Sequence, residues 1–153
     1  MPREILQRGF AFHQAGDLEN AAELYRQSLA LCRSAEGHTL MGAVYHAQGR
    51  FDEAIAECKK AIEIDENFGM AFHDIGMYMV LKGKWDESVE WFQRAIDSTH
   101  YDTPQFGWSN VGMVYMVRGL YKSARECFER ALAIDPNHEV SKERLERVRR
   151  LEQ

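Results

Sequence analysis

A pair of glycines recurs four times along the chain, and this recurrence limits the fold more than any other feature. Counted at the second glycine of each pair, the steps are 33, 34 and 36 residues. These second glycines are Gly16, Gly49, Gly83 and Gly119. The first glycines, seven residues earlier in each case, are Gly9, Gly42, Gly76 and Gly112. Such a period is typical of an array in which one small structural unit is stacked several times.

Each unit is predicted to form two helices joined at the second glycine. In the second unit, HTLMGAVYHAQ predicts the first helix and DEAIAECKKAIEI predicts the second. The second helix is amphipathic, because its apolar residues recur at helical spacing. These residues are Ala54, Ile55, Cys58, Ala61 and Ile62. Only three prolines occur among the 153 residues, which favours an all-α fold.

The two glycines of a pair have different expected roles. The second one occupies the turn after the first helix, where the backbone conformation favours glycine. The first one lies inside a helix, where glycine costs about 1 kcal/mol relative to alanine. Its recurrence needs a packing reason, and we expect the paired helix to approach closely at this point.

The fourth unit contains a pattern of small and aromatic residues that is specific to one repeat family. The pattern comprises Trp108, Val111, Gly112, Tyr115, Gly119, Tyr121, Ala124, Phe128, Ala131 and Pro136. On these residues the chain resembles the tetratricopeptide-repeat (TPR) family, although Cys58 replaces the usual larger ring in the second unit. The resemblance implies one all-α domain, an α-α superhelix of eight repeat helices. The expected repeats are residues 2–34, 35–68, 69–102 and 105–136, followed by a capping helix over 137–152.

Two segments depart from the repeat pattern. The capping segment contains four arginines and four glutamates, so we expect its charges to offset one another. Contact of these arginines with an acidic partner or with lipid head groups is the alternative. The link DSTHYDTPQ between the third and fourth units is two residues longer than the 34-residue period. It is either a projecting contact loop containing His100 and Tyr101 or surface variation without a role.

The resemblance also implies a ligand groove on the concave surface, lined by the first helix of each unit. Its candidate contact residues are Leu6, Phe10, His13, Thr39, His46, Met70, His73, Met77, Phe106, Ser109, Met113 and Met116. Leu6 and Phe10 stand where the TPR proteins that grip chaperone C-termini have a lysine and an asparagine, which disfavours carboxylate binding. Flexible methionines are instead typical of adaptable apolar surfaces. Packing between neighbouring helices is the alternative role for many of these residues.

Other classes of function find little support. The net charge of −5 argues against a nucleic-acid partner. His13 and His46 occupy equivalent positions, but His73 is offset by about 10 Å along its helix, so we expect no metal site. We expect polar contacts to a ligand from these histidines, or titration near pH 6 to 7. Enzyme motifs are absent, so we expect neither catalysis nor a cofactor.

The predicted function is a non-enzymatic adaptor that binds an apolar peptide or helix in the groove. A self-associating assembly module, for example in a pilus- or secretion-type complex, is the alternative and includes a homodimer. No apolar run approaches 18 residues and no signal segment is visible, so we expect a cytoplasmic protein without membrane insertion. Trp91 and Cys127, at equivalent places in successive units, form a second candidate patch on the convex side.

Overall fold

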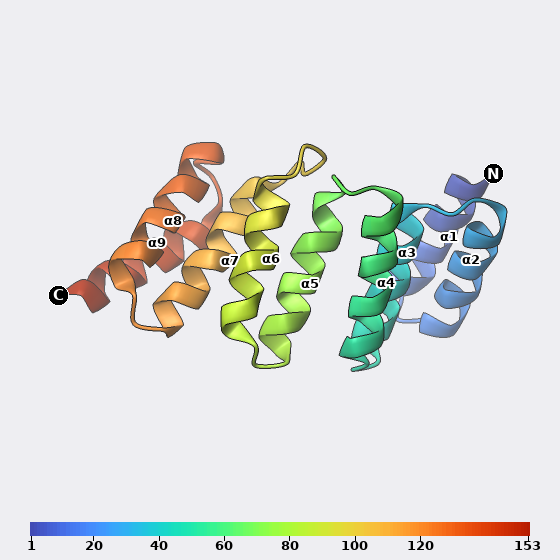
Figure 1. Cartoon of the computed structure of the whole chain (residues 1–153), viewed down its shortest axis with the longest axis horizontal. Helices are drawn as coiled ribbons and strands as arrows, with labels where there is room; N and C mark the ends of the chain where they lie inside the picture. Colours follow the sequence, from blue (N-terminus) through green and yellow to red (C-terminus); the bar gives the residue numbers. More distant parts are fainter.

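The computed structural model describes residues 1–153 and contains nine helices and no strand. The helices are α1 (Pro2–Gln14), α2 (Leu18–Leu31), α3 (Ala35–Ala47), α4 (Phe51–Ile64), α5 (Gly69–Leu81), α6 (Trp85–Ile96), α7 (Pro104–Val117), α8 (Tyr121–Ile134) and α9 (Glu139–Glu152). They follow one another in a row, with the two chain ends at opposite ends of the array (Figure 1). The predicted all-α solenoid is confirmed.

Packing between helices gives the array an inner and an outer layer. Each first helix packs against the second helix of its own unit, and each second helix packs against the first helix of the next unit. In addition, α1 contacts α3, α3 contacts α5, and α7 contacts α9, whereas no two second helices contact each other to a comparable extent. Except for α5 and α7, neighbouring first helices therefore lie closer together than the second helices do, and this places the first helices on the concave side of the superhelix.

Both expected roles of the glycines are confirmed. The four second glycines have φ between 75° and 82°, a left-handed conformation that favours glycine. Inside the first helices, a Cβ added to Gly112 would lie 2.5 Å from the ring of Phe128. Gly42 differs, because the nearest atoms to such a Cβ are the carbonyl oxygen of Ala54 at 3.1 Å and the Sγ of Cys58 at 3.3 Å. The smaller Cys58 side chain thus leaves more room in the second repeat.

The helix α9 closes the array as expected, beginning at Glu139 rather than at residue 137. Its side chains Leu145 and Val148 are buried and belong to one apolar cluster with Ala124 and Phe128 of α8. Val140 and Leu151, predicted for the same apolar stripe, are 44% and 46% exposed. The capping role therefore rests on the middle of α9.

The link between α6 and α7 folds back on the array. His100 exchanges backbone hydrogen bonds with the turn before α5, accepting from Gly69 N at 3.0 Å and donating to Asn67 O at 3.1 Å. Tyr101 is 7% exposed and packs in a cluster with Phe72 and Ala95. The prediction of a projecting contact loop is therefore wrong for Tyr101, because the inserted residues place this ring in the core. None of the nine helices has the length and apolar character needed to cross a bilayer.

Candidate functional site

The inner surface formed by α1, α3, α5, α7 and α9 presents part of the predicted groove to solvent. Phe10 is 46% exposed, Met70 41% and Phe106 43%. The imidazole of His46 is also exposed. The accessible apolar residues thus come from the first, third and fourth repeats.

Three predicted groove residues, Leu6, Thr39 and Ser109, are buried. The Thr39 hydroxyl donates to backbone carbonyls of its own helix, at 2.8 Å to Glu36 O and 3.2 Å to Ala35 O. Leu6 is 5% exposed but lines a small cavity of about 240 Å³ together with Phe10 and residues of α3. The family pattern places these residues on the correct helices, but close packing with the neighbouring helix covers their side chains.

The three remaining methionines of the groove are half-buried. Met77 packs against the apolar cluster around Phe92 and Val111, between the third and fourth repeats. Met116 packs against the cluster at the α8–α9 contact. The Sδ atom of Met113 lies 3.6 Å from Nη2 of Arg144. These side chains form a wall of the groove and at the same time connect the repeats.

The histidines of the groove have three different environments. Burial, followed by the nearby His46, lowers the pKa of His13. The His46 ring lies 5.3 Å from the ring of Tyr78, between α3 and α5. His73 Nδ1 shares a hydrogen bond with the Tyr101 hydroxyl at 2.6 Å, and burial lowers the pKa of His73 to about 4. The expected titration of His73 near pH 6 to 7 is therefore wrong. No three His, Cys, Asp or Glu side chains gather as ligands of a metal ion.

The family positions omit Asp74, which lies next to His73 on α5. Burial raises the pKa of this carboxyl group to about 7, and no hydrogen bond or nearby cation lowers it. A negative charge on Asp74 raises the pKa of Cys58, Tyr78 and Tyr101. None of these three groups supplies a positive charge. A carboxylate in such surroundings is poorly stabilised at neutral pH. The only sequence signal of this burial is the apolar residues Phe72 and Ile75 close to Asp74.

The family positions also omit the arginines of α9. Arg144 donates from Nη1 to the backbone oxygen and the hydroxyl of Ser109, at 3.0 and 2.9 Å. Arg144, Arg147 and Arg150 line a cavity of about 450 Å³ together with Val140 and Glu143. The inner surface therefore continues from α7 onto α9. The sequence signal is the spacing of three residues between these arginines, which places them on adjacent turns of one helix.

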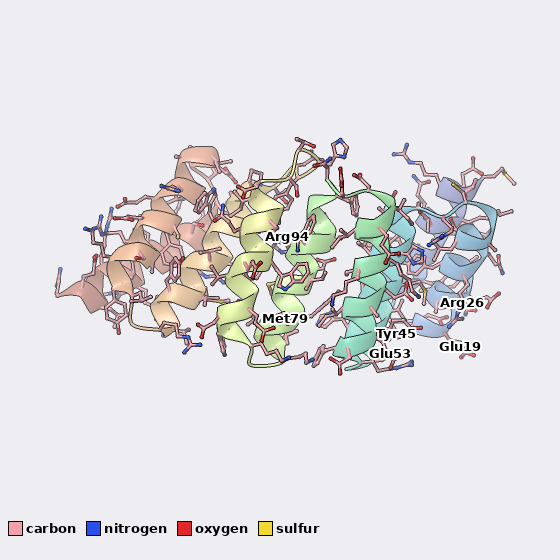
Figure 2. The ribbon with its side chains drawn as sticks, in the orientation of Figure 1. Glu19, Arg26, Tyr45, Glu53, Met79 and Arg94 are labelled. Carbon is pink, nitrogen blue, oxygen red and sulfur yellow. The ribbon has the colours of Figure 1, made fainter.

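The outer surface has two features of its own. Arg94 lies between α5 and α6 (Figure 2), with its guanidinium 4.5 Å from the ring centroid of Phe72 and 4.8 Å from that of Trp91. Cys127 is 6% exposed, so the predicted patch of Trp91 and Cys127 is wrong. An open cavity of about 870 Å³ beside Arg94 has a rim of mostly acidic and polar residues from the end of α4, the turn that follows it and the segment after α6. It is separate from the predicted groove.

Comparison with known proteins gives the family and several relatives of different function. Three segments, residues 10–39, 35–68 and 105–138, match the tetratricopeptide repeat. The Photosystem I assembly protein Ycf3 of Prochlorococcus marinus is 34% identical over 100 residues, which are 58% of this chain and 58% of that protein. The human protein O-mannosyl-transferase TMTC1 is 29% identical over 121 residues, 76% of this chain but only 14% of the enzyme. The chain thus spans little more than half of one relative and a small part of the other.

A solved structure reported as the functional characterization of Pseudomonas aeruginosa pilF has the same fold. It superposes with a TM-score of 0.88 at 21% sequence identity, covering 96% of this chain and 67% of that chain. The Type IV pilus assembly protein PilF of the same organism is 23% identical over 133 residues, 86% of this chain and 53% of PilF. The repeat period, the recurring glycine pairs and these matches agree, and the chain belongs to the tetratricopeptide-repeat family.

Proposed function

We propose that the chain is a non-enzymatic scaffold that binds an apolar peptide or helix of another protein along its inner surface. The TPR fold supports a protein–protein interaction scaffold. The observation that favours the inner surface is the exposure of Phe10, Met70 and Phe106 beside half-buried methionines. Side chains of this kind accept an apolar helix through anchors spaced along a groove.

The names of two relatives favour a role in assembly. Ycf3 is named as a photosystem I assembly protein and PilF as a type IV pilus assembly protein. TMTC1 is named as a transferase, but this chain covers only a small part of it. We therefore place the chain among scaffolds that bring other proteins together, and a cytoplasmic location stays a prediction.

Selection of displayed peptides on the purified chain, followed by affinity measurement, tests the inner surface. The groove variant is Met70→Glu/Phe106→Glu, because both side chains are exposed and their replacement leaves the core intact. The control is Ile64→Glu/Ile134→Glu, which places the same charges at exposed apolar positions that end the outer helices α4 and α8. We expect at least tenfold weaker binding to the groove variant and unchanged binding to the control. Equal binding to both variants would refute the proposal that the peptide binds in the groove.

Self-association is the second candidate, and the exposed Val140 and Leu151 on α9 favour it. Deleting residues 137–153 is a poor test, because the deletion would uncover the cluster around Phe128. Light scattering over a concentration series, with Val140→Glu/Leu151→Glu beside the unmodified chain, is sharper. Self-association predicts a concentration-dependent dimer that the substitutions abolish, and a monomer at all concentrations excludes it.

A further inference from the structure

We propose that the arginine face of α9, formed by Arg144, Arg147 and Arg150, binds acidic side chains that flank the apolar segment held in the groove. This inference rests on the proposed function and adds the chemistry of one end of the partner. The occupant is a segment of another protein in which Asp or Glu residues adjoin apolar ones.

The arginine face is continuous with the apolar part of the inner surface. Arg144 contacts Ser109 and Met113, both of which are groove positions on α7. The ring of Phe106 lies 4.7 Å from that of His138, directly before the start of α9. A segment lying along α7 therefore reaches α9 without leaving the surface.

The charge of this face is not neutralised within the chain. None of the three arginines has a carboxylate within ion-pair distance, whereas Arg118 pairs with Asp86 at 2.8 Å. Two of the four glutamates expected to offset these arginines form ion pairs with other residues. Glu139 pairs with Lys142 and Glu152 pairs with Arg125, so neither is available to the arginine face.

Only one carboxylate, that of Glu143, lines the same cavity as the three arginines. The net charge of these four side chains is therefore positive, and the expected balance of charges along α9 does not hold on this face. An anionic partner would be attracted by this cluster, because the protein supplies too few carboxylates to neutralise its arginines.

Arg144 is also held in place before any partner binds. Its guanidinium is fixed by the backbone and hydroxyl oxygens of Ser109, and burial lowers its pKa. A cation that is partly removed from water and lacks a counter-ion gains from a carboxylate delivered beside it. The oxygens of Ser109 orient the group without neutralising it.

The spacing of the arginines favours several acidic side chains over one terminal carboxylate. Residues three apart rise about 4.5 Å along a helix, so the charges of Arg144, Arg147 and Arg150 extend over about 9 Å. A single carboxylate meets one or two of these groups, whereas two or three acidic residues of a partner meet all of them. The adjoining apolar surface favours a protein segment over a lipid head group.

The test is a selection from a library of displayed peptides whose C-termini are fused to the carrier, so that only side chains offer carboxylates. The disrupted variant is Arg147→Glu/Arg150→Glu, since both side chains are exposed and Arg144 keeps its contacts. The control is Lys142→Glu/Arg149→Glu, which changes the net charge equally at exposed positions of α9 outside the cavity lining. Circular dichroism and thermal unfolding establish that both variants are folded.

We expect peptides selected on the unmodified chain to combine apolar residues with neighbouring Asp or Glu. Replacing these acids by Asn or Gln weakens binding about tenfold, and the same loss appears with Arg147→Glu/Arg150→Glu but not with the control. Apolar peptides without acidic enrichment would overturn this inference and leave the apolar groove in place. Failure to select any peptide would overturn both this inference and the proposed groove. Arginine-dependent binding to phosphatidylglycerol vesicles, without any peptide binding, would also overturn both.

Discussion

The hydroxyl of Tyr101 lies 2.6 Å from Nδ1 of His73, and this hydrogen bond joins the inserted loop to the inner helix α5. Tyr101 also fills the space beside Gly69, where an added Cβ would be 2.3 Å from the Tyr101 Cβ. The same ring lies beside Gly107 of α7, where an added Cβ would be 3.4 Å from Tyr101 Cε1, so the loop takes part in the contact between the third and fourth repeats.

Truncation of this ring has a larger expected effect than removal of its hydroxyl. Tyr101→Phe removes one hydrogen bond and lowers the free energy of unfolding by about 1 kcal/mol. Tyr101→Ala also leaves a cavity and lowers it by about 3–5 kcal/mol. Urea unfolding followed by circular dichroism measures both values. Equal, small losses for the two variants would show that the ring is not part of the core.

The first glycines predict a graded response to alanine. At Gly112 the new Cβ meets the buried Phe128 ring, and we expect a loss of about 1–3 kcal/mol from overpacking. At Gly42 the contacts are longer, and the better helix propensity of alanine, worth about 1 kcal/mol, opposes the strain. In thermal unfolding, Gly112→Ala should have a clearly lower melting temperature than Gly42→Ala. The reverse order would contradict the packing reason for these glycines.

The pKa of Asp74, raised to about 7, predicts how stability changes with pH. The folded protein binds this proton more tightly than the unfolded chain, whose carboxyl titrates near 4. Stability is therefore lost through this group as the pH rises from 4 to 7, by roughly 1.4 kcal/mol for each unit between the two pKa values. His73, with a pKa of about 4 when folded, acts in the opposite direction over much of this range.

Asp74→Asn separates the two contributions. Unfolding free energies of this variant and the unmodified chain should be close at pH 4 and should diverge as the pH rises, with the variant more stable at pH 8. Comparison at each pH cancels the effect of His73, which is present in both proteins. A stability difference that does not change with pH would show that Asp74 titrates normally.

The three cysteines predict selective reactivity. Cys32 is exposed, whereas Cys58 and Cys127 are buried. Burial raises the pKa of the Cys127 thiol to about 11 and raises that of Cys58 further. A maleimide at pH 7.5 should therefore modify Cys32 first, as detected by mass spectrometry of peptides. Rapid modification of Cys58 in the native protein would contradict its place between Gly42 and the core.

Most of the fold could be predicted from the sequence because the repeat is encoded locally. Gly49 needs a left-handed backbone and Gly76 needs a close neighbour, and both requirements are visible as a period. The inserted loop could not be predicted in the same way. The burial of Tyr101 depends on the distance between α5 and α7, which no local pattern encodes.

The candidate site was predictable to the level of helices but not of side chains. The exposed Phe10 and the buried Thr39 both occupy groove positions of the family, and only helix spacing decides which of them meets solvent. Arg144 is not among the groove positions of the family because α9 lies outside the repeat pattern, and the sequence offered contact of the α9 arginines with an acidic partner only as an alternative. The distribution of charge on α9 likewise follows from partners on other helices.

Methyl NMR spectra of the methionines give the most direct test of the inner surface as the binding site. Met70, Met77, Met113 and Met116 lie along the groove, while the buried Met41 and Met79 serve as controls in the same spectrum. Titration with a selected apolar peptide should shift the four groove methyl signals and leave the two buried ones unchanged. Binding that leaves all four groove signals in place would contradict the central claim and direct attention to the outer surface.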